Sequence, residues 1–329
     1  MTKHDVLEIL SKEKNGYVSG EKISKIFNVS RAAVNAAVRA LRLDGFDILS
    51  STNKGYCLKS IPDIISKETV AKYLPPERVS AIRFNSTVGS TNNLLRDMAF
   101  EGACDGSAVV AEEQTAGRGR SGRDFLSPKG KGIYISYLFR PDDIPAGVSS
   151  ITAWTAVAVC RALFRLCNIK PGIKWVNDLV LNSKKLCGIL TELSVESESG
   201  HIQHIIIGIG LNTGEDRTDF TGNLSNIATS LRIETGKVVC RAELTAEIIK
   251  ELDKMCNGWP FEKQSYLHEY RENCITVGKD ISIVSNGVER TGKAIRVNDD
   301  FSLHVAYSDG TESDLKSGEV SVRGLCGYV

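Results

Sequence analysis

The stretch that decides most about the fold is Gly117-Arg118-Gly119-Arg120-Ser121-Gly122-Arg123. It places three arginines among glycines, which lose a large backbone entropy when they become ordered. Arginine pairs well with phosphate and carboxylate groups through planar, charge-assisted hydrogen bonds. We therefore expect a loop that is mobile until it closes over an anionic ligand. The alternative is a flexible basic surface loop.

The same stretch fits G-x-G-x-x-G, the glycine pattern of dinucleotide-binding folds. That fold needs a strand directly before the glycines and a helix that opens directly after them. Residues 107–112 suit a strand, but Arg123-Asp124-Phe125-Leu126-Ser127-Pro128 leads into a stretch broken by proline and glycine. The sequence also lacks a G-x-x-x-x-G-K-[ST] phosphate loop. These observations argue against a dinucleotide-binding fold.

Composition sets broad limits on the chain. Its 329 residues suffice for two or three domains, and 42% hydrophobic and 25% charged residues are ordinary for a globular protein. The net charge of +1 predicts no general attraction to nucleic acid or membranes. There is no apolar run long enough to cross a bilayer, and the N-terminus lacks the apolar core of a signal peptide.

Cysteine and histidine usage speaks against a metal site. The nine cysteines are odd in number and never occur in C-x-x-C spacing, so we expect reduced thiols, a cytoplasmic protein and no zinc. His201 and His204 flank or enter a predicted strand and are expected at its surface.

The N-terminal segment, residues 1–62, is predicted to be a winged helix-turn-helix DNA-binding domain. Two short helical patterns flank Asn28-Val29-Ser30, and the stretches 46–50 and 55–58 suggest a small hairpin, or wing. Residues 1–60 hold ten Lys+Arg and six Asp+Glu, a formal charge of +4. The alternative is a helical packing module with a solvated outer face.

The second of these helices should carry the DNA contacts. Helical spacing turns Val34, Val38 and Leu41 to the core and leaves four polar side chains outward: Arg31, Asn35, Arg39 and Arg42. We expect Arg31, Asn35 and Arg39 to contact the DNA. Arginine pairs with guanine, and asparagine with adenine, in the major groove.

Residues 63–272 are predicted to form a central α/β domain with a mixed sheet. Strand-like and helix-like patterns alternate, and 151–166 is the clearest long helix because its apolar residues fall near one face. Gly89-Ser90-Thr91-Asn92-Asn93 allows two interpretations. Its hydroxyl and amide groups can cap the helix predicted after them, or they can contact a small polar ligand.

Two further segments place polar residues beside predicted strands. Lys174-Trp175-Val176-Asn177-Asp178 suits a turn, since asparagine and aspartate favour turns. Lys185 heads the otherwise apolar strand Leu186-Cys187-Gly188-Ile189-Leu190. A lysine that enters a core needs an anionic partner, because an unpaired buried charge is costly.

The run Ile205-Ile206-Ile207-Gly208-Ile209-Gly210-Leu211-Asn212 predicts a buried strand. Gly208 and Gly210 are two residues apart and therefore share one face. Glycine weakens a strand unless something must approach the backbone closely. Either a flat ligand lies against this face, or the glycines serve a bulge or tight packing.

Taken together and in this order, these segments resemble the biotin–protein ligases. The resemblance is carried by Gly89-Ser90-Thr91-Asn92, Gln114 with the 117–123 loop, Lys174-Trp175-Val176-Asn177-Asp178, residues 185–190 and residues 208–212. With its N-terminal segment the chain looks like the bifunctional kind that also represses biotin genes, and the resemblance covers nearly its whole length. One departure is Val176, where the family usually has proline; it changes the rigidity of the turn more than the chemistry.

The resemblance implies an ATP-dependent ligase with two half-reactions. Biotin and ATP, with Mg²⁺, give biotinyl-5′-AMP and pyrophosphate, and a lysine of a biotin-carrier protein then attacks the mixed anhydride. Because the first step brings two anions together, positive groups must neutralise both. By resemblance, Arg118 and Arg120 lie over the carboxylate and phosphate, and Lys185 bridges them. Asp178, the fourth expected catalytic residue, and Asn177 would orient magnesium, phosphate or the incoming lysine, and the sequence does not choose among these roles.

The resemblance also assigns the ligand contacts. The biotin pocket is expected to be formed by Ser90, Thr91, Asn92, Gln114, Arg118, Gly119, Arg120, Lys185, Gly208 and Gly210. The nucleotide side is expected to be formed by Arg120, Phe125, Asn177 and Asn212. A closed arginine loop would keep water from the hydrolysable acyl-adenylate.

The C-terminal segment, residues 273–329, shows short alternating runs. Asn286-Gly287, Asn298-Asp299-Asp300 and Asp309-Gly310 separate them, and such pairs favour hairpin turns. This pattern predicts a small antiparallel β-barrel, and the family carries an SH3-like barrel there. The overall fold class expected is therefore α+β.

The family implies operator DNA as a second partner, bound by a homodimer that forms when the adenylate is present; no membrane partner is expected. Three alternatives stay open. One is a ligase whose N-terminal module only packs against the enzyme. Another is a transcription factor that senses a small carboxylate without catalysis, against which Lys185 and Arg120 argue. The last is a lipoate ligase or octanoyltransferase, against which the helix-turn-helix and the full arginine loop argue.

Overall fold

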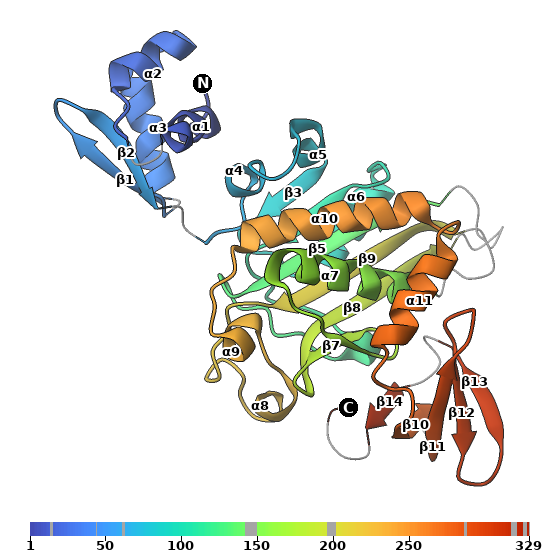
Figure 1. The fold of residues 1–329 in the computed structure, drawn as a ribbon. Helices are drawn as coiled ribbons and strands as arrows, with labels where there is room; N and C mark the ends of the chain where they lie inside the picture. Colours follow the sequence, from blue (N-terminus) through green and yellow to red (C-terminus); the bar gives the residue numbers. More distant parts are fainter. Residues whose placement is uncertain are drawn as a thin grey trace. The chain divides into compact units, whose positions relative to one another are not determined.

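The computed structural model describes residues 1–13, 16–43, 45–60, 63–141, 150–195, 202–285, 288–316, 321–324 and 328. The chain divides into two compact units, Met1–Ile64 and Ile65–Val329. Figure 1 shows the elements of each unit along the chain.

The first unit combines helices with a hairpin. Its elements are α1 (Lys3–Lys12), α2 (Gly20–Phe27), α3 (Arg31–Leu43) and the antiparallel strands β1 (Asp47–Ser51) and β2 (Gly55–Ser60). The Ser19 hydroxyl caps α2 by accepting from the Lys22 amide at 3.1 Å, and Asn28 ends that helix in the left-handed conformation. Val34 and Val38 of α3 are fully buried in the core of this unit. The sequence predicted α2, α3 and the hairpin, but it did not predict α1.

A mixed seven-stranded sheet organises the described part of the second unit. Its strand order is β3-β4-β5-β9-β8-β7-β6; β3 and β4 are parallel and the other neighbours are antiparallel. The strands are β3 (Ile82–Asn85), β4 (Ala108–Ala111), β5 (Gly132–Phe139), β6 (Gly172–Lys174), β7 (Asp178–Leu181), β8 (Lys184–Val195) and β9 (Ile202–Asn212). The predicted mixed α/β sheet is thus confirmed.

Helices cover both faces of this sheet (Figure 1). On one face, α7 (Ile151–Cys167) packs against α10 (Arg241–Gly258) and α11 (Lys263–Asn273); α6 (Thr91–Phe100) contacts β4, β5 and β9 on the other. Shorter segments connect them: α4 (Lys67–Val70), α5 (Pro76–Ser80), the 3-10 turn η1 (Arg120–Gly122), α8 (Leu224–Ile227) and α9 (Leu231–Thr235). No helix that the structure describes is both long and apolar enough to span a bilayer.

Strand β9 shows which side chains face which layer. Ile206 packs in the α6 cluster, whereas its neighbour Ile207 belongs to the large core under α7 and α10. Because side chains alternate along a strand, Gly208 and Gly210 share the α6 face with Ile206. By the same rule His204 lies on the α6 face. It is 2% exposed, and its ring packs edge-on against that of Phe100.

The expectation that His204 lies at the surface is therefore wrong. β9 is a central strand covered on both faces, so side chains on either of its faces can be buried, and His204 lies on the face that α6 covers. His201 lies outside the described residues.

The C-terminal strands form an open antiparallel sheet in the part of the chain described. They are β10 (Asp280–Ser285), β11 (Val288–Val297), β12 (Leu303–Tyr307), β13 (Glu312–Leu315) and β14 (Ser321–Gly324), in the order β13-β12-β11-β10-β14. Turns at 298–302 and 308–311 fall where the sequence predicted them, and Asn286-Gly287 lies outside the described residues. No described pairing joins β13 to β14, so the sheet is not closed into a barrel by these residues.

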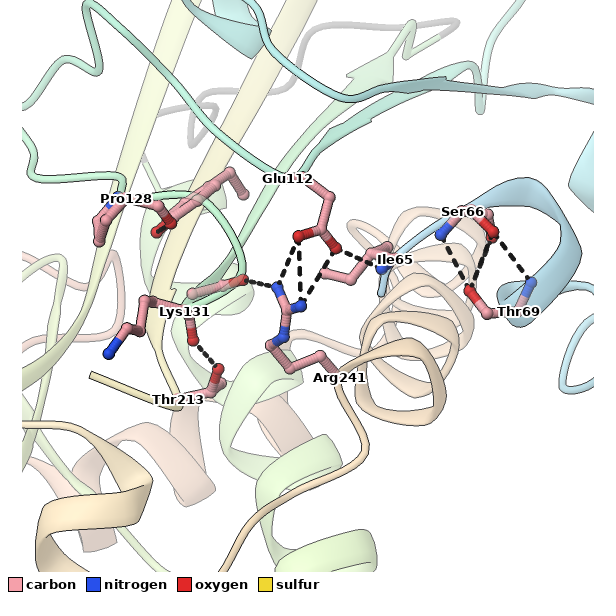
Figure 2. Close-up of polar contacts among 10 residues, drawn as sticks. Ile65, Ser66, Thr69, Glu112, Pro128, Lys131, Thr213 and Arg241 are labelled. Carbon is pink, nitrogen blue, oxygen red and sulfur yellow. Dashed lines mark hydrogen bonds and ion pairs between the residues drawn. The ribbon is translucent and has the colours of Figure 1, made fainter. Parts of the chain in front are cut away.

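A buried ion pair ties distant parts of the second unit together (Figure 2). Arg241, at the start of α10, is 1% exposed, and Glu112, directly after β4, is 4% exposed. The guanidinium donates to Glu112 Oε2 at 3.2 and 3.3 Å, and to the carbonyl of Gly132 at 3.0 Å. The amide of Ile65 donates to Glu112 Oε1. One carboxylate thus joins α10 and the beginning of the whole unit to the end of β4.

A second carboxyl near Arg241 has no such partner. Glu215, in the loop after β9, is 0% exposed, and neither of its carboxyl oxygens has a partner of normal geometry among the described residues. Burial raises the pKa of Glu215 to about 7, while backbone N–H groups of Glu215 and Thr213 and the charge of Arg241 offset only part of that rise.

We predict that Arg241→Met destabilises the second unit strongly. It leaves the Glu112 carboxylate buried without a counter-charge, which costs about 3–5 kcal/mol in the free energy of unfolding. Urea unfolding measures the change. The control is Arg290→Met, because Arg290 and Asp309 are largely solvated and such pairs contribute about 1 kcal/mol or less. Equal losses in the two variants would contradict a special role for the buried pair.

We also predict a pH-dependent gain from Glu215→Gln. The folded pKa of Glu215, about 7, lies above its ordinary value of 4.5, so the protonated carboxyl contributes stability below pH 4.5 that is lost as pH rises through 7. Relative to the parent, the variant should gain stability between pH 5 and pH 8, on the order of 3 kcal/mol. Urea unfolding across this range, with exposed Glu101→Gln as the control, tests it. A constant difference between variant and parent would refute the prediction.

Candidate functional site

One cavity in the second unit collects most of the predicted site residues. It lies on the α6 side of the sheet, where the start of α6, the arginine loop, β8 and β9 meet. Its lining consists of Ser90, Thr91, Asn92, Gln114, Arg118, Gly119, Arg120, Phe125, Asn177, Lys185, Gly188, Ile189, Leu190, Gly208, Ile209 and Gly210. All ten residues expected around biotin are in this set, with Phe125 and Asn177 from the nucleotide list.

Two predicted residues lie outside the lining. Asp178 stands behind it and makes an ion pair with Lys185. Asn212 is buried at the end of β9, and its amide donates to the carbonyl of Thr229 at 2.9 Å. The structure therefore gives Asn212 a role in holding the loop after β9 and does not bring it to the cavity wall.

One end of the cavity is a network of neutral polar groups. The Gln114 side-chain carbonyl accepts from the Thr91 amide at 2.9 Å and from its hydroxyl at 3.0 Å, while its amide donates to Ser127 Oγ at 2.9 Å. The Ser136 hydroxyl lies 2.8 Å from Thr91 Oγ1 and 2.5 Å from Asn92 Oδ1. Such a satisfied network fixes its members in one arrangement and suits recognition of a small polar ring.

The start of α6 answers the question of capping. Ser90 occupies the N-cap position, but its side chain makes no capping hydrogen bond. The Ser90 hydroxyl therefore does not cap α6, although Ser90 lines the cavity. Backbone hydrogen bonds from the amide of Thr115 to the carbonyl of Val88 at 2.9 Å, and from the amide of Ala116 to the carbonyl of Gly89 at 2.8 Å, hold this segment beside the loop that carries Gln114.

The two glycines of β9 make room for side chains that reach over the sheet. A Cβ at Gly208 would lie 2.3 Å from Asn92 Oδ1, and a Cβ at Gly210 would lie 2.4 Å from the Phe125 ring. Neither distance is sterically tolerable, so only glycine permits these approaches. Asn92 is held there by its amide, which donates to Glu192 Oε2 at 2.7 Å.

The other end of the cavity is cationic. Lys185 Nζ lies 2.7 Å from Asp178 Oδ1, which supplies the anionic partner that the sequence required. Arg120 reaches across from the arginine loop, and its guanidinium donates to Asn177 Oδ1 at 3.3 Å. Burial lowers the pKa of Arg120, and the charge of Asp178 opposes this shift. A cation desolvated in this way interacts strongly with an incoming anion.

The arginine loop folds back on itself like a narrow hairpin and does not begin an α-helix. The amide of Phe125 donates to the carbonyl of Gly117 at 2.9 Å, and that of Gly119 to the carbonyl of Arg123 at 2.6 Å. Only the short η1 turn interrupts it. This geometry agrees with the rejection of a dinucleotide-binding turn.

Sequence reasoning missed three polar residues of the site. Ser136 lies in an otherwise apolar, fully buried strand, and Glu192 lies in β8, where each is paired with Asn92. Ser127 contacts Gln114 from the far side of the arginine loop. A lone serine inside the run 132–139 is the one local signal that was available, because a buried hydroxyl needs a partner.

The first unit presents the predicted DNA-binding residues on α3. Arg31, Asn35 and Arg39 are exposed, whereas Val34 and Val38 on the opposite side of the helix are fully buried. The hairpin is fixed to this helix by Arg42, whose guanidinium donates to the carbonyl of Ile48 and to Ser50 Oγ at 2.6 Å. The unit therefore offers an exposed, basic helix face beside a braced hairpin.

Among the described residues no cluster of three or more His, Cys, Asp or Glu is arranged to hold a metal ion. The cavity thus offers cations and neutral hydrogen-bonding groups to a ligand. This set suits a ligand with a negatively charged group at one end and a polar ring at the other.

Comparisons with known proteins agree with this geometry. Residues 2–57 match the model of the HTH domain, and residues 84–212 match the Biotin/lipoate A/B protein ligase family. The bifunctional ligase/repressor BirA of Bacillus subtilis is 34% identical over 251 residues, which cover 76% of this chain and 77% of that protein. BirA of Escherichia coli is 29% identical over 319 residues, 96% of this chain and 97% of that protein. A biotin protein ligase from Aquifex aeolicus, solved with biotin and ATP, has a TM-score of 0.65 at 26% identity over 74% of this chain and 98% of that one.

Proposed function

Because this chain belongs to the biotin–protein ligases of the bifunctional ligase/repressor type, we propose that it joins biotin to a lysine of a biotin-carrier protein through biotinyl-5′-AMP and represses biotin genes when that adenylate is bound. The observation that carries the proposal is the cavity itself. Its neutral network faces its cationic end, and the whole lies over two glycines.

The neutral end is suited to the ureido ring of biotin. Thr91, Asn92 and Gln114 offer donors and acceptors whose positions are fixed by Ser136 and Ser127. The fused rings would lie over the part of β9 where Gly208 and Gly210 carry no side chains, beside Asn92 and Phe125, which reach over the same strand. In this orientation the biotin carboxylate points toward Lys185 and Arg120.

In the first half-reaction a biotin carboxylate oxygen attacks the α-phosphorus of ATP, and pyrophosphate leaves. Two anions must approach each other, so neutralisation by Arg118, Arg120 and Lys185 lowers the barrier. Mg²⁺ would enter with the ATP phosphates, which is its usual mode of binding and needs no dedicated protein cage. Phe125 and Asn177 lie at the cavity wall where the nucleotide would extend.

In the second half-reaction the uncharged amine of the acceptor lysine attacks the acyl carbon, an amide forms and AMP leaves. Asp178, next to Lys185, is suited to orient the incoming amine or to balance the positive charge that develops on it. The arginine loop acts as a lid that keeps water from the acyl-adenylate. We infer a cytoplasmic location, because the cysteine pattern predicts reduced thiols.

The regulatory half of the proposal rests on the first unit and its exposed α3. Binding of the adenylate would order loops near the cavity and favour a homodimer, which can match a two-fold operator. We keep the assignment of residues 1–62 to DNA binding, 63–272 to catalysis and 273–329 to an SH3-like module that packs on the catalytic part. The contrasting possibility, a ligase without repression, differs only in this first segment.

Ligation is tested by incubating the protein with ATP, Mg²⁺, biotin and a carrier domain, and by following the mass gain on one lysine. We predict that Lys185→Ala lowers the rate of adenylate formation by ~100-fold or more, because the developing charge loses its preorganised partner. Its neighbour Lys184 donates to the carbonyl of Ser225, away from the cavity, so Lys184→Ala is the matched control. Near-parental adenylation by Lys185→Ala would remove that residue from the mechanism, and no mass gain with the parent protein would defeat the ligase proposal.

Repression is tested by a gel-shift titration on biotin-gene operator DNA with and without biotin and ATP. We predict that both substrates together tighten binding and that the affinity falls steeply with salt, as counterion release requires. Arg39→Ala should weaken binding by about 1–3 kcal/mol if it reads a base. Exposed Lys12→Ala on α1, whose ammonium pairs with Glu8, is the control. Binding that ignores the substrates, or none at all, would favour the ligase without repression.

A further inference from the structure

The C-terminal end of the chain reaches the cationic end of the cavity. The hydroxyl of Tyr328 donates a hydrogen bond to Asp178 Oδ2, while Lys185 Nζ lies 2.7 Å from Oδ1 of the same carboxylate. One carboxylate is therefore shared between a phenol and an ammonium group. Tyr328 lies 150 residues beyond Asp178 in the sequence, and no sequence motif pointed to it.

A second contact fixes the position of this tyrosine. Lys174 Nζ donates to the backbone carbonyl of Tyr328 and lies 3.8 Å from the centre of its ring. Lys174 is itself buried, at 8% exposed. The segment that begins with Lys174 and ends with Asp178 thus holds Tyr328 at both the backbone and the side chain.

Further hydrogen bonds fix the start of the segment from Lys174 to Asp178. Trp175, which follows Lys174, donates from its amide to Thr276 Oγ1 at 2.9 Å and from its indole to the carbonyl of Phe301 at 2.9 Å. The amide of Ile275 donates to the carbonyl of Ile173 at 3.0 Å. Residues just before the C-terminal sheet, and a loop between two of its strands, are therefore bonded to the segment that leads to Asp178.

The Tyr328 hydroxyl stays protonated and therefore always acts as a hydrogen-bond donor to Asp178. Burial raises the pKa of Tyr328 far above its ordinary value, and the neighbouring charge of Asp178 and their hydrogen bond raise it further. A donor on Oδ2 limits rotation of the carboxylate, so Oδ1 stays directed at Lys185. Charge-assisted bonds of this kind are the stronger ones and confer orientation.

We propose that Tyr328 is a positioning residue of the ligase reaction: its hydroxyl orients Asp178, and Asp178 in turn holds the Lys185 ammonium where the biotin carboxylate and the α-phosphate meet. This inference rests on the proposed ligase function. It makes Tyr328 a part of the active site.

The test compares Tyr328→Phe with Tyr307→Phe, a matched removal of a hydroxyl that bonds only Ser313 within the C-terminal sheet. Pyrophosphate release with biotin, ATP and Mg²⁺ reports adenylate formation. Tyr328→Phe should lower kcat about 10-fold, because the carboxylate loses the donor that orients it, while KM for biotin changes less than about twofold. Tyr307→Phe should behave as the parent, and cooperative urea unfolding should show that both variants are folded.

A double-mutant cycle shows whether the tyrosine acts through Asp178. In an Asp178→Asn background, Tyr328→Phe should have no further effect on kcat, because the bond has already lost its charged acceptor. Additive losses would overturn the inference, as would a parental or faster rate in the single variant. If the parent protein itself releases no pyrophosphate, the proposed function fails; if the parent is active and Tyr328→Phe matches it, only the role of Tyr328 fails.

Discussion

Lys185 heads strand β8 with its ammonium group 2.7 Å from Asp178, at the end of a cavity walled by the sheet. A positive charge in this position is tolerated because it is paired, yet the pair is only partly buried and open to a ligand anion. Arg120 approaches the same point from a glycine-rich loop, and burial lowers the pKa of its guanidinium. The proposed chemistry depends on this concentration of positive charge, because two anions would have to be brought together there.

The rest of the catalytic unit orients a ligand toward that point. Gly208 and Gly210 carry no side chains, so the side chains of Asn92 and Phe125 can lie directly over β9. Ser136, on the neighbouring strand β5, fixes Asn92 by a hydrogen bond. In the proposed binding mode, the ligand is held by neutral hydrogen bonds at one end and met by cations at the other. Binding energy gained at the neutral end can be used at the reacting end, where orientation lowers the barrier.

Sequence reasoning reached those features whose physical cause is local. The alternation rule placed Gly208 and Gly210 on one face, and the cost of an unpaired charge required a partner for Lys185. Helical spacing separated Val34 and Val38 from the exposed residues of α3. These patterns need only the periodicity of one element, so the chain alone reveals them.

The features that escaped depend on contacts between distant segments. Glu192 meets Asn92 100 residues away, and Asn212 turns to the carbonyl of Thr229 and away from the cavity. The burial of His204 follows from the central place of β9 in the sheet, which no pattern within the strand discloses. Small changes of topology would alter all three without changing a single local motif.

The hydrogen bond from the Ile65 amide to Glu112 fixes the point at which the chain enters the second unit. Glu112 precedes Gln114 by two residues, and Arg241 locks it to α10, so the chain enters the second unit at a point bound rigidly to the wall of the cavity. A ligand that stiffens the segment around Gln114 would therefore also stiffen the residues through which the chain enters this unit.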